Sequence, residues 1–174
     1  SLGFYNYYGD ISNQKRIIGS YDMIQKVLKK LDLSCSYYIR GRLNTKEFFN
    51  ELPFKVKVDV LNSELYEKAI EFHIIDGYRY KINYSLNDNE YEFFHYFDST
   101  ETTNHYSIKA KLNSYLDFNR VKNISKTNYS VMFHSEKYWM NNIISNLSIE
   151  NIEYTSLLVI NLVDEIPERS RMIL

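Results

Sequence analysis

The chain has 174 residues, and its contents of 44% hydrophobic and 25% charged residues allow a packed core and exclude global disorder. A formal net charge of −1 gives no overall field that would attract nucleic acid, so we exclude nucleic acid as a partner. Tyrosine and phenylalanine, with 17 and 10 copies, favour strands because their rings suit half-buried pleated surfaces.

The first expected element is a helix over residues 17–31. Apolar side chains recur there at steps of three and four residues, which places them on one helix face. Ser20 stands at an N-cap position. A strand over residues 36–39 should follow, and then a short helix over residues 46–52, which Pro53 ends.

From residue 54 to about residue 111 the apolar pattern has a period of two, which is typical of strands with one buried face. Residues 55–60 alternate without a break. The runs 71–75 and 78–82 flank Asp76-Gly77, a dipeptide that predicts a hairpin. With two more strands over residues 91–97 and 106–112, this region predicts an antiparallel β-meander or a small sandwich.

The last third of the chain mixes helix and strand. We expect a strand over residues 129–133 and a helix over residues 136–147. The run 154–163 has too few polar residues for an edge strand, so we expect it to be central and buried on both faces. A new helix should begin near Pro167. This order of elements predicts an α+β fold.

Histidines offer the nearest approach to a catalytic motif. His105-Tyr106-Ser107 matches one half of the His-x-Ser/Thr pair used by two-histidine phosphodiesterases, in which two imidazoles act as acid and base. The second half is missing, because the hydroxyl next to His134 has the wrong spacing. His73 and His95 have no ligand partner at metal-site spacing. We therefore expect no catalytic residue, no metal and no cofactor.

Tyrosine-rich strands could also stack on sugar rings, because an aromatic face matches the apolar face of a pyranose. This makes a carbohydrate-binding β-rich module an alternative function, although the same rings would also fill a β core. The first choices for stacking are Tyr78, Tyr80 and Trp139, and the wider set adds Tyr84, Tyr91 and Tyr96.

Two segments resemble a known family. Residues 17–38 carry a helix that ends in Leu-Asp-Leu and then Ser-Tyr-Tyr, and the match continues through Gly41-Arg42 to Pro-Phe-Lys-Val at 53–56. Residues 157–174 lead from an apolar strand through Pro167-Glu168-Arg169 into a helix. In this order the segments resemble polysaccharide chain-length determinants, or polysaccharide co-polymerases, and their tyrosine-autokinase relatives.

The resemblance implies a non-catalytic periplasmic domain that regulates the chain length and export of a surface polysaccharide, such as O-antigen, capsule or exopolysaccharide. It implies a homo-oligomeric ring, with the polymerase and export machinery as partners and the growing glycan as a further one. Anchoring helices in the inner membrane would lie outside this sequence, since both of its ends read as cuts inside a longer protein. No kinase motif lies in these residues, and a cytoplasmic tyrosine kinase in the parent protein is left open.

The same resemblance implies a domain plan. Residues 1–174 would form one domain, with a membrane-proximal α/β base layer over 1–57 and 127–174 and a β insertion over 58–126. Charged residues near a subunit boundary fix register. The candidates for an interaction surface are Arg40, Arg42, Glu168 and Arg169.

Overall fold

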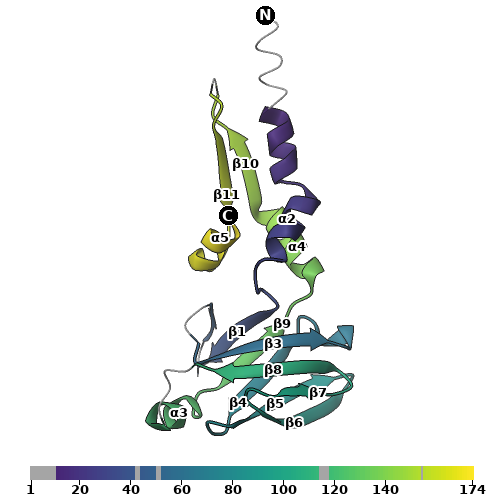
Figure 1. Ribbon diagram of the computed structural model, residues 1–174, viewed down its shortest axis with the longest axis vertical. Coiled ribbons are helices and arrows are strands. Elements are labelled where there is room, and N and C mark those ends of the chain that lie inside the picture. Colours follow the sequence, from purple (N-terminus) through teal and green to yellow (C-terminus); the bar gives the residue numbers. More distant parts are fainter. Residues whose placement is uncertain (1–10, 42–43, 50–51, 114–117, 154) are drawn as a thin grey trace, which may run out of the picture. The chain divides into compact units, whose positions relative to one another are not determined.

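The computed structural model (Figure 1) describes residues 11–41, 44–49, 52–113, 118–153 and 155–174. It divides the chain into two compact units. Unit 1 comprises Ser1–Leu33 and Glu136–Leu174, and unit 2 comprises Ser34–Ser135. No helix in the described residues is long and apolar enough to cross a membrane.

The expected α+β fold with an α/β base layer is wrong. Strands make up 42% and helices 27% of the structure, and the strands form three antiparallel sheets. The strands expected at 36–39 and 129–133 belong to the largest of these sheets and to no α/β layer. Tertiary pairing between segments far apart in the sequence has therefore overridden the expected layer.

Unit 2 is built on a six-stranded sheet. Its strands are β1 (Cys35–Arg40), β2 (Thr45–Phe48), β4 (Ala69–Ile74), β5 (Arg79–Leu86), β6 (Asn89–Tyr96) and β9 (Tyr129–Phe133). Their order across the sheet is β2-β1-β9-β4-β5-β6. The predicted hairpin at Asp76-Gly77 is confirmed, since β4 pairs with β5 across it. The β5–β6 turn has positive φ angles at Asn87 and Asp88, as tight hairpin turns require.

The predicted helix over residues 46–52 is wrong, because Thr45–Phe48 forms strand β2. This segment pairs with β1 from Tyr37 to Arg40, which satisfies its backbone groups. Threonine and phenylalanine suit a strand, and pairing outweighs the weak helix preference of Lys46 and Glu47.

A three-stranded sheet completes unit 2, with the order β3-β8-β7. Its strands are β3 (Phe54–Val60), β7 (Thr100–Thr102) and β8 (Tyr106–Leu112), and a 3-10 helix (Ser63–Leu65) and α3 (Phe118–Ile124) lie in the connections. Aromatic side chains join the two sheets. Phe54 of β3 stacks on Phe72 of β4, with ring centroids 4.3 Å apart, and meets Tyr129 of β9 edge-on. The predicted alternation is confirmed, because β4 and β5 bury every second residue in this core.

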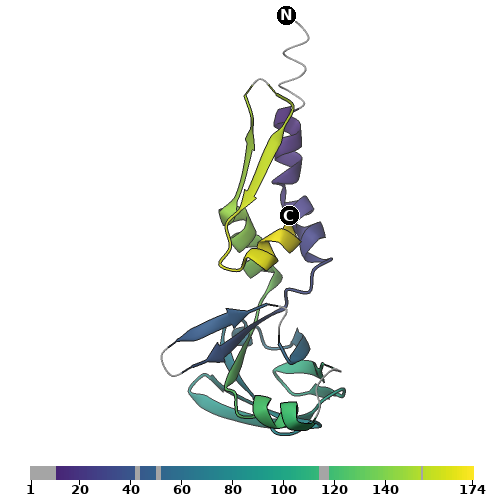
Figure 2. The same cartoon turned by 90° about the vertical axis from the view of Figure 1, so that its left-hand side faces the viewer.

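Unit 1 combines helices with a two-stranded sheet (Figure 2). Residues 11–18 are helical, and the elements that follow are α2 (Tyr21–Leu28), α4 (Glu136–Asn146), β10 (Leu147–Asn151), β11 (Leu158–Leu162) and α5 (Pro167–Ile173). The Ser20 hydroxyl caps α2, as predicted, by accepting from the N–H of Met23. Gln25 of α2 reaches Glu136 of α4 at 2.6 Å, and the Trp139 indole donates to the Leu33 carbonyl.

The expectation that the apolar run near residues 154–163 is central and buried is also wrong. Among the described residues strand β11 pairs with β10 alone, and Val159 and Ile160 are 38% and 37% exposed. Periodicity shows that a strand is apolar on both faces but does not supply a second pairing partner. In the described residues this strand has one neighbouring strand, so Val159 and Ile160 are exposed and Leu158 and Leu162 are only half-buried.

Candidate functional site

Aromatic and charged side chains meet on the outer face of the six-stranded sheet, at the end that carries the β4–β5 hairpin. Apart from Leu61, every large apolar side chain exposed in the described part of unit 2 lies at this end: Ile75, Tyr78, Phe94 and Tyr96. Tyr96 lies opposite Arg79 on the neighbouring strand, and Phe94 lies opposite Lys81. We call Ile75, Arg79, Lys81, Phe94 and Tyr96 the outer-face patch.

The rings of the outer-face patch are open to solvent. Phe94 and Tyr96 are 62% and 58% exposed, and they share a face because they stand two residues apart on one strand. Strand geometry sets their Cα atoms about 6.7 Å apart. In the part of the chain that the structure describes, β6 is the edge strand of its sheet, and β5 is its one hydrogen-bonded neighbour.

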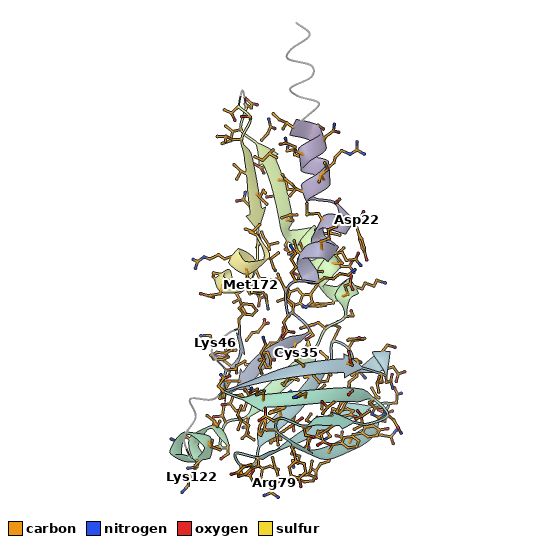
Figure 3. The ribbon with its side chains drawn as sticks, viewed as in Figure 1. Asp22, Cys35, Lys46, Arg79, Lys122 and Met172 are labelled. Carbon is orange, nitrogen blue, oxygen red and sulfur yellow. The ribbon has the colours of Figure 1, made fainter. Side chains whose placement is uncertain are left out.

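Ion pairs border these rings. Lys81 Nζ lies 2.9 Å from Glu92 Oε2 and 5.9 Å from the ring centroid of Phe94. The Arg79 guanidinium donates to Asp76 Oδ2 through Nε at 3.0 Å and Nη2 at 2.7 Å, and this bond lowers the pKa of the Asp76 carboxyl. Figure 3 labels Arg79 at this end of unit 2. Two cations and two carboxylates balance, so the rings are bordered by donors and acceptors without net charge.

The predicted stacking residues lie in different environments. Tyr78 is 79% exposed at the hairpin turn. Tyr80 is buried against Phe72, with ring centroids 4.7 Å apart, and burial raises the pKa of its phenol. Trp139 is buried in unit 1 beneath the Arg169 guanidinium, which lies 5.0 Å from its ring. Neither buried ring offers a face to a ligand.

Within the wider set, Tyr84 is also buried, Tyr91 is half-buried and Tyr96 is exposed. Phe94 was missed by the sequence analysis. The signal for it was present, because Phe94 stands two residues before Tyr96 in an alternating strand and must share its face.

The four charged candidates for an interaction surface are not brought together as one site. Arg40 of β1 pairs with Glu71 of β4 at 3.2 Å on the outer face of unit 2. Glu168 is exposed in the first turn of α5. Arg169 is buried in unit 1, where its Nε and Nη2 donate to Asp164 at 2.8 and 2.7 Å. Arg42 lies outside the described residues.

A buried hydroxyl–imidazole–carboxylate array lies where the chain enters and leaves unit 2. His134 Nε2 is hydrogen-bonded to Ser36 Oγ at 2.8 Å, and His134 Nδ1 is bonded to Glu67 Oε2. The other Glu67 oxygen accepts from the N–H of Ser135 at 3.1 Å. Sequence spacing gives no signal for this array, because its members are 98 and 67 residues apart.

The order of groups in this array matches that of a nucleophile, its base and an orienting acid. A nucleophile must also reach its substrate, whereas Ser36 is 4% exposed and the His134 side chain 1% exposed. The array joins the start of β1 to the residue after β9 and to Glu67, two residues before β4. It therefore ties three chain segments together at one end of the sheet.

The two histidines weighed for a phosphodiesterase belong to separate clusters. His105 Nδ1 is bonded to the Tyr84 hydroxyl at 2.6 Å, whereas His134 belongs to the buried array. His95 is buried, bonded through Nε2 to the Tyr106 hydroxyl at 2.8 Å, and burial lowers the pKa of its imidazole.

Among the described residues, no three His, Cys, Asp or Glu side chains gather as the ligands of a metal would. Comparison with known proteins gives no identity: no protein-family model matches the chain, and no curated protein matches it.

Apolar side chains are also exposed on unit 1. Most of the large apolar side chains that are exposed in the described residues belong to this unit, including Ile17, Tyr21, Ile144, Ile152, Leu157, Val159, Ile160 and Val163. Four of these lie on or next to β11, with Leu157, Val159 and Val163 on one face of the strand and Ile160 on the other. We call these four residues, which flank the open strand edge, the β11 surface. An apolar strand with an open edge is a site at which another chain can add.

Proposed function

We propose that the chain is the non-catalytic extracytoplasmic domain of an inner-membrane protein that regulates the chain length and export of a surface polysaccharide. The resemblance of residues 17–56 and 157–174 to chain-length determinants supports this function. Anchoring helices would lie outside this sequence, and the polymerase and export machinery of the polysaccharide would be the partners.

Among the structural observations, the β11 surface gives this proposal its main support. It combines an open strand edge with four exposed apolar side chains, and it lies within the second segment of the resemblance. A scaffold that works as a ring needs such a surface on every copy, because each interface of a closed ring joins two different patches of the same chain. In the proposed assembly, a neighbouring copy covers the β11 surface.

The chemistry of unit 2 supports a scaffold rather than an enzyme. Among its described residues, the one nucleophile–base–acid array has a buried hydroxyl and imidazole and links chain segments. The remaining histidines are bonded to tyrosine hydroxyls or lie on the sheet surface. A ring-forming scaffold acts through the geometry it imposes on its partners, so it needs no reacting group.

The decisive experiment is the length distribution of the surface polysaccharide on a gel, from cells with and without the parent gene. We expect deletion to replace a defined length band with short or random lengths, and the wild-type gene to restore the band. An unchanged ladder in the deletion strain, with polymer still made, would contradict the proposal.

Two variants test the role of the β11 surface in the same cells. Val159→Glu with Val163→Glu places two charges on the surface and should fail to restore the length band. Leu61→Glu is the control, since Leu61 is an apolar residue of unit 2 whose exposure lies between those of Val159 and Val163, and it should restore the band. Equal restoration by both variants would refute the role of the β11 surface.

A further inference from the structure

We propose that the outer-face patch of unit 2 binds the polysaccharide itself, by stacking of pyranose rings on Phe94 and Tyr96. This inference takes the identity of the polymer from the proposed function, whereas the binding surface is defined by unit 2 alone. The shape of the two side chains, their exposure and the charges around them suit a sugar ligand.

The rings of Phe94 and Tyr96 have the form that sugar stacking needs. Both are flat, both are more than half exposed, and both project from the same face of strand β6. In the described residues neither ring packs against another aromatic ring, whereas the core tyrosines and phenylalanines form two series of such contacts that His95 joins. Lys81 Nζ lies over the Phe94 ring at 5.9 Å from its centroid, and the exposed parts of both rings are available to a ligand.

The ion pairs that border the outer-face patch favour a sugar over a protein as its ligand. Lys81 with Glu92 and Arg79 with Asp76 supply donors and acceptors beside the rings. Hydroxyl groups of a sugar can bond to both members of each ion pair while its apolar face lies on the rings. A protein partner would instead have to bury both ion pairs, which is costly, and the centres of protein interfaces are depleted in charged residues.

The balanced charges of the outer-face patch predict that binding does not depend on salt. Two cations beside two carboxylates give no net attraction for an anionic polymer, so binding should depend on stacking and hydrogen bonds. Such binding should persist at about 0.5 M salt, where the Debye length is only about 4 Å and attraction between exposed charges is screened. The edge position of β6 suits a long chain, since a polymer can run past the edge without a closed pocket.

The test is affinity gel electrophoresis of the full chain through gels that contain polysaccharide. The probes are the purified surface polysaccharide of the source cells and the neutral polymers dextran, xylan and laminarin. We expect the source polysaccharide to retard the chain, with the same retardation at low salt and after addition of about 0.5 M NaCl. Phe94→Ala with Tyr96→Ala should weaken the binding about tenfold or more.

Leu61→Ala is the matched control, and it should bind like the wild type. All three substitutions are at exposed positions, and an unchanged near-ultraviolet circular dichroism spectrum shows that the core is intact. Any one of three results would overturn the inference: no retardation of the wild type by any probe, equal retardation of the double variant, or loss of retardation in salt.

Failure of the binding inference can be distinguished from failure of the proposed function. A chain that no polysaccharide retards can still set the length band in cells, which would leave the scaffold proposal in place without direct glycan contact. A chain that binds polysaccharide but leaves the cellular ladder unchanged on deletion would instead be a carbohydrate-binding module.

Discussion

Replacement of His134 by alanine should destabilise unit 2 strongly, although the residue lies outside the main aromatic core. Its side chain is 1% exposed and connects Ser36 of β1 to Glu67, the residue two before β4. The alanine variant removes the imidazole partner of a buried hydroxyl and of a carboxylate in one step.

The expected loss in the free energy of unfolding follows from these two contacts. A buried hydroxyl that loses its partner costs about 1–3 kcal/mol, and a hydrogen bond to a charged group contributes about 1.5–3 kcal/mol. The two costs do not add fully, because Glu67 is partly exposed and still accepts from the N–H and the hydroxyl of Ser135. We expect a loss of about 2–3 kcal/mol in the free energy of unfolding.

Urea unfolding of the full chain measures this loss. Near-ultraviolet circular dichroism follows the tyrosine-rich core of unit 2, while fluorescence of the single tryptophan, Trp139, follows unit 1. The midpoint of the circular dichroism transition should fall by about 1 M or more. His73→Ala is the control: its side chain is 35% exposed and 3.4 Å from Glu71, so its cost should stay within about 0.5 kcal/mol. Equal midpoints for His134→Ala and His73→Ala would show that the buried hydrogen bonds of His134 do not stabilise unit 2.

Three further predictions concern the titration of unit 2 and the buried ion pair of unit 1. Burial lowers the pKa of the His95 imidazole, so the unfolded chain binds a proton there more readily than the folded chain. The free energy of unfolding should therefore fall as pH drops below about 6.5. His95→Phe should flatten the dependence of this free energy on pH in that range, and an unchanged slope would show that His95 does not cause it. Burial raises the pKa of Tyr84 to about 12 and also raises the pKa values of Tyr80 and Tyr106, so stability should fall above about pH 10. The last rise in phenolate absorbance comes from these three buried tyrosines and should coincide with the loss of circular dichroism. Phenolate formation that is complete before the chain unfolds would contradict this prediction. Arg169→Lys cannot keep both hydrogen bonds to Asp164, so it should lower the free energy of unfolding of unit 1 by about 2–4 kcal/mol. It should also shift the fluorescence emission of Trp139, and an unaltered emission spectrum would rule out the contact between Arg169 and Trp139.

Local patterns in the sequence were sufficient for the elements whose structure depends on near neighbours. The alternation in residues 55–60 and 71–82 predicted strands and their buried faces, and Asp76-Gly77 predicted the hairpin between two of them. Ser20 predicted the start of α2, because a side-chain cap involves a backbone group only three residues away. Exposure of Tyr96 and Phe94 also follows from alternation, once strand β6 is known to have a buried side.

Long-range pairing decided the rest. Thr45–Phe48 became a strand because β1 was available beside it, and β11 became exposed because it has β10 as its one partner in the described residues. Ser36, Glu67 and His134 meet only after three strands have aligned, so no spacing in the sequence marks them. The period of a pattern shows which sides of a segment are apolar. Which partner covers those sides depends on free energies of packing between distant segments, and these are determined only in the folded chain.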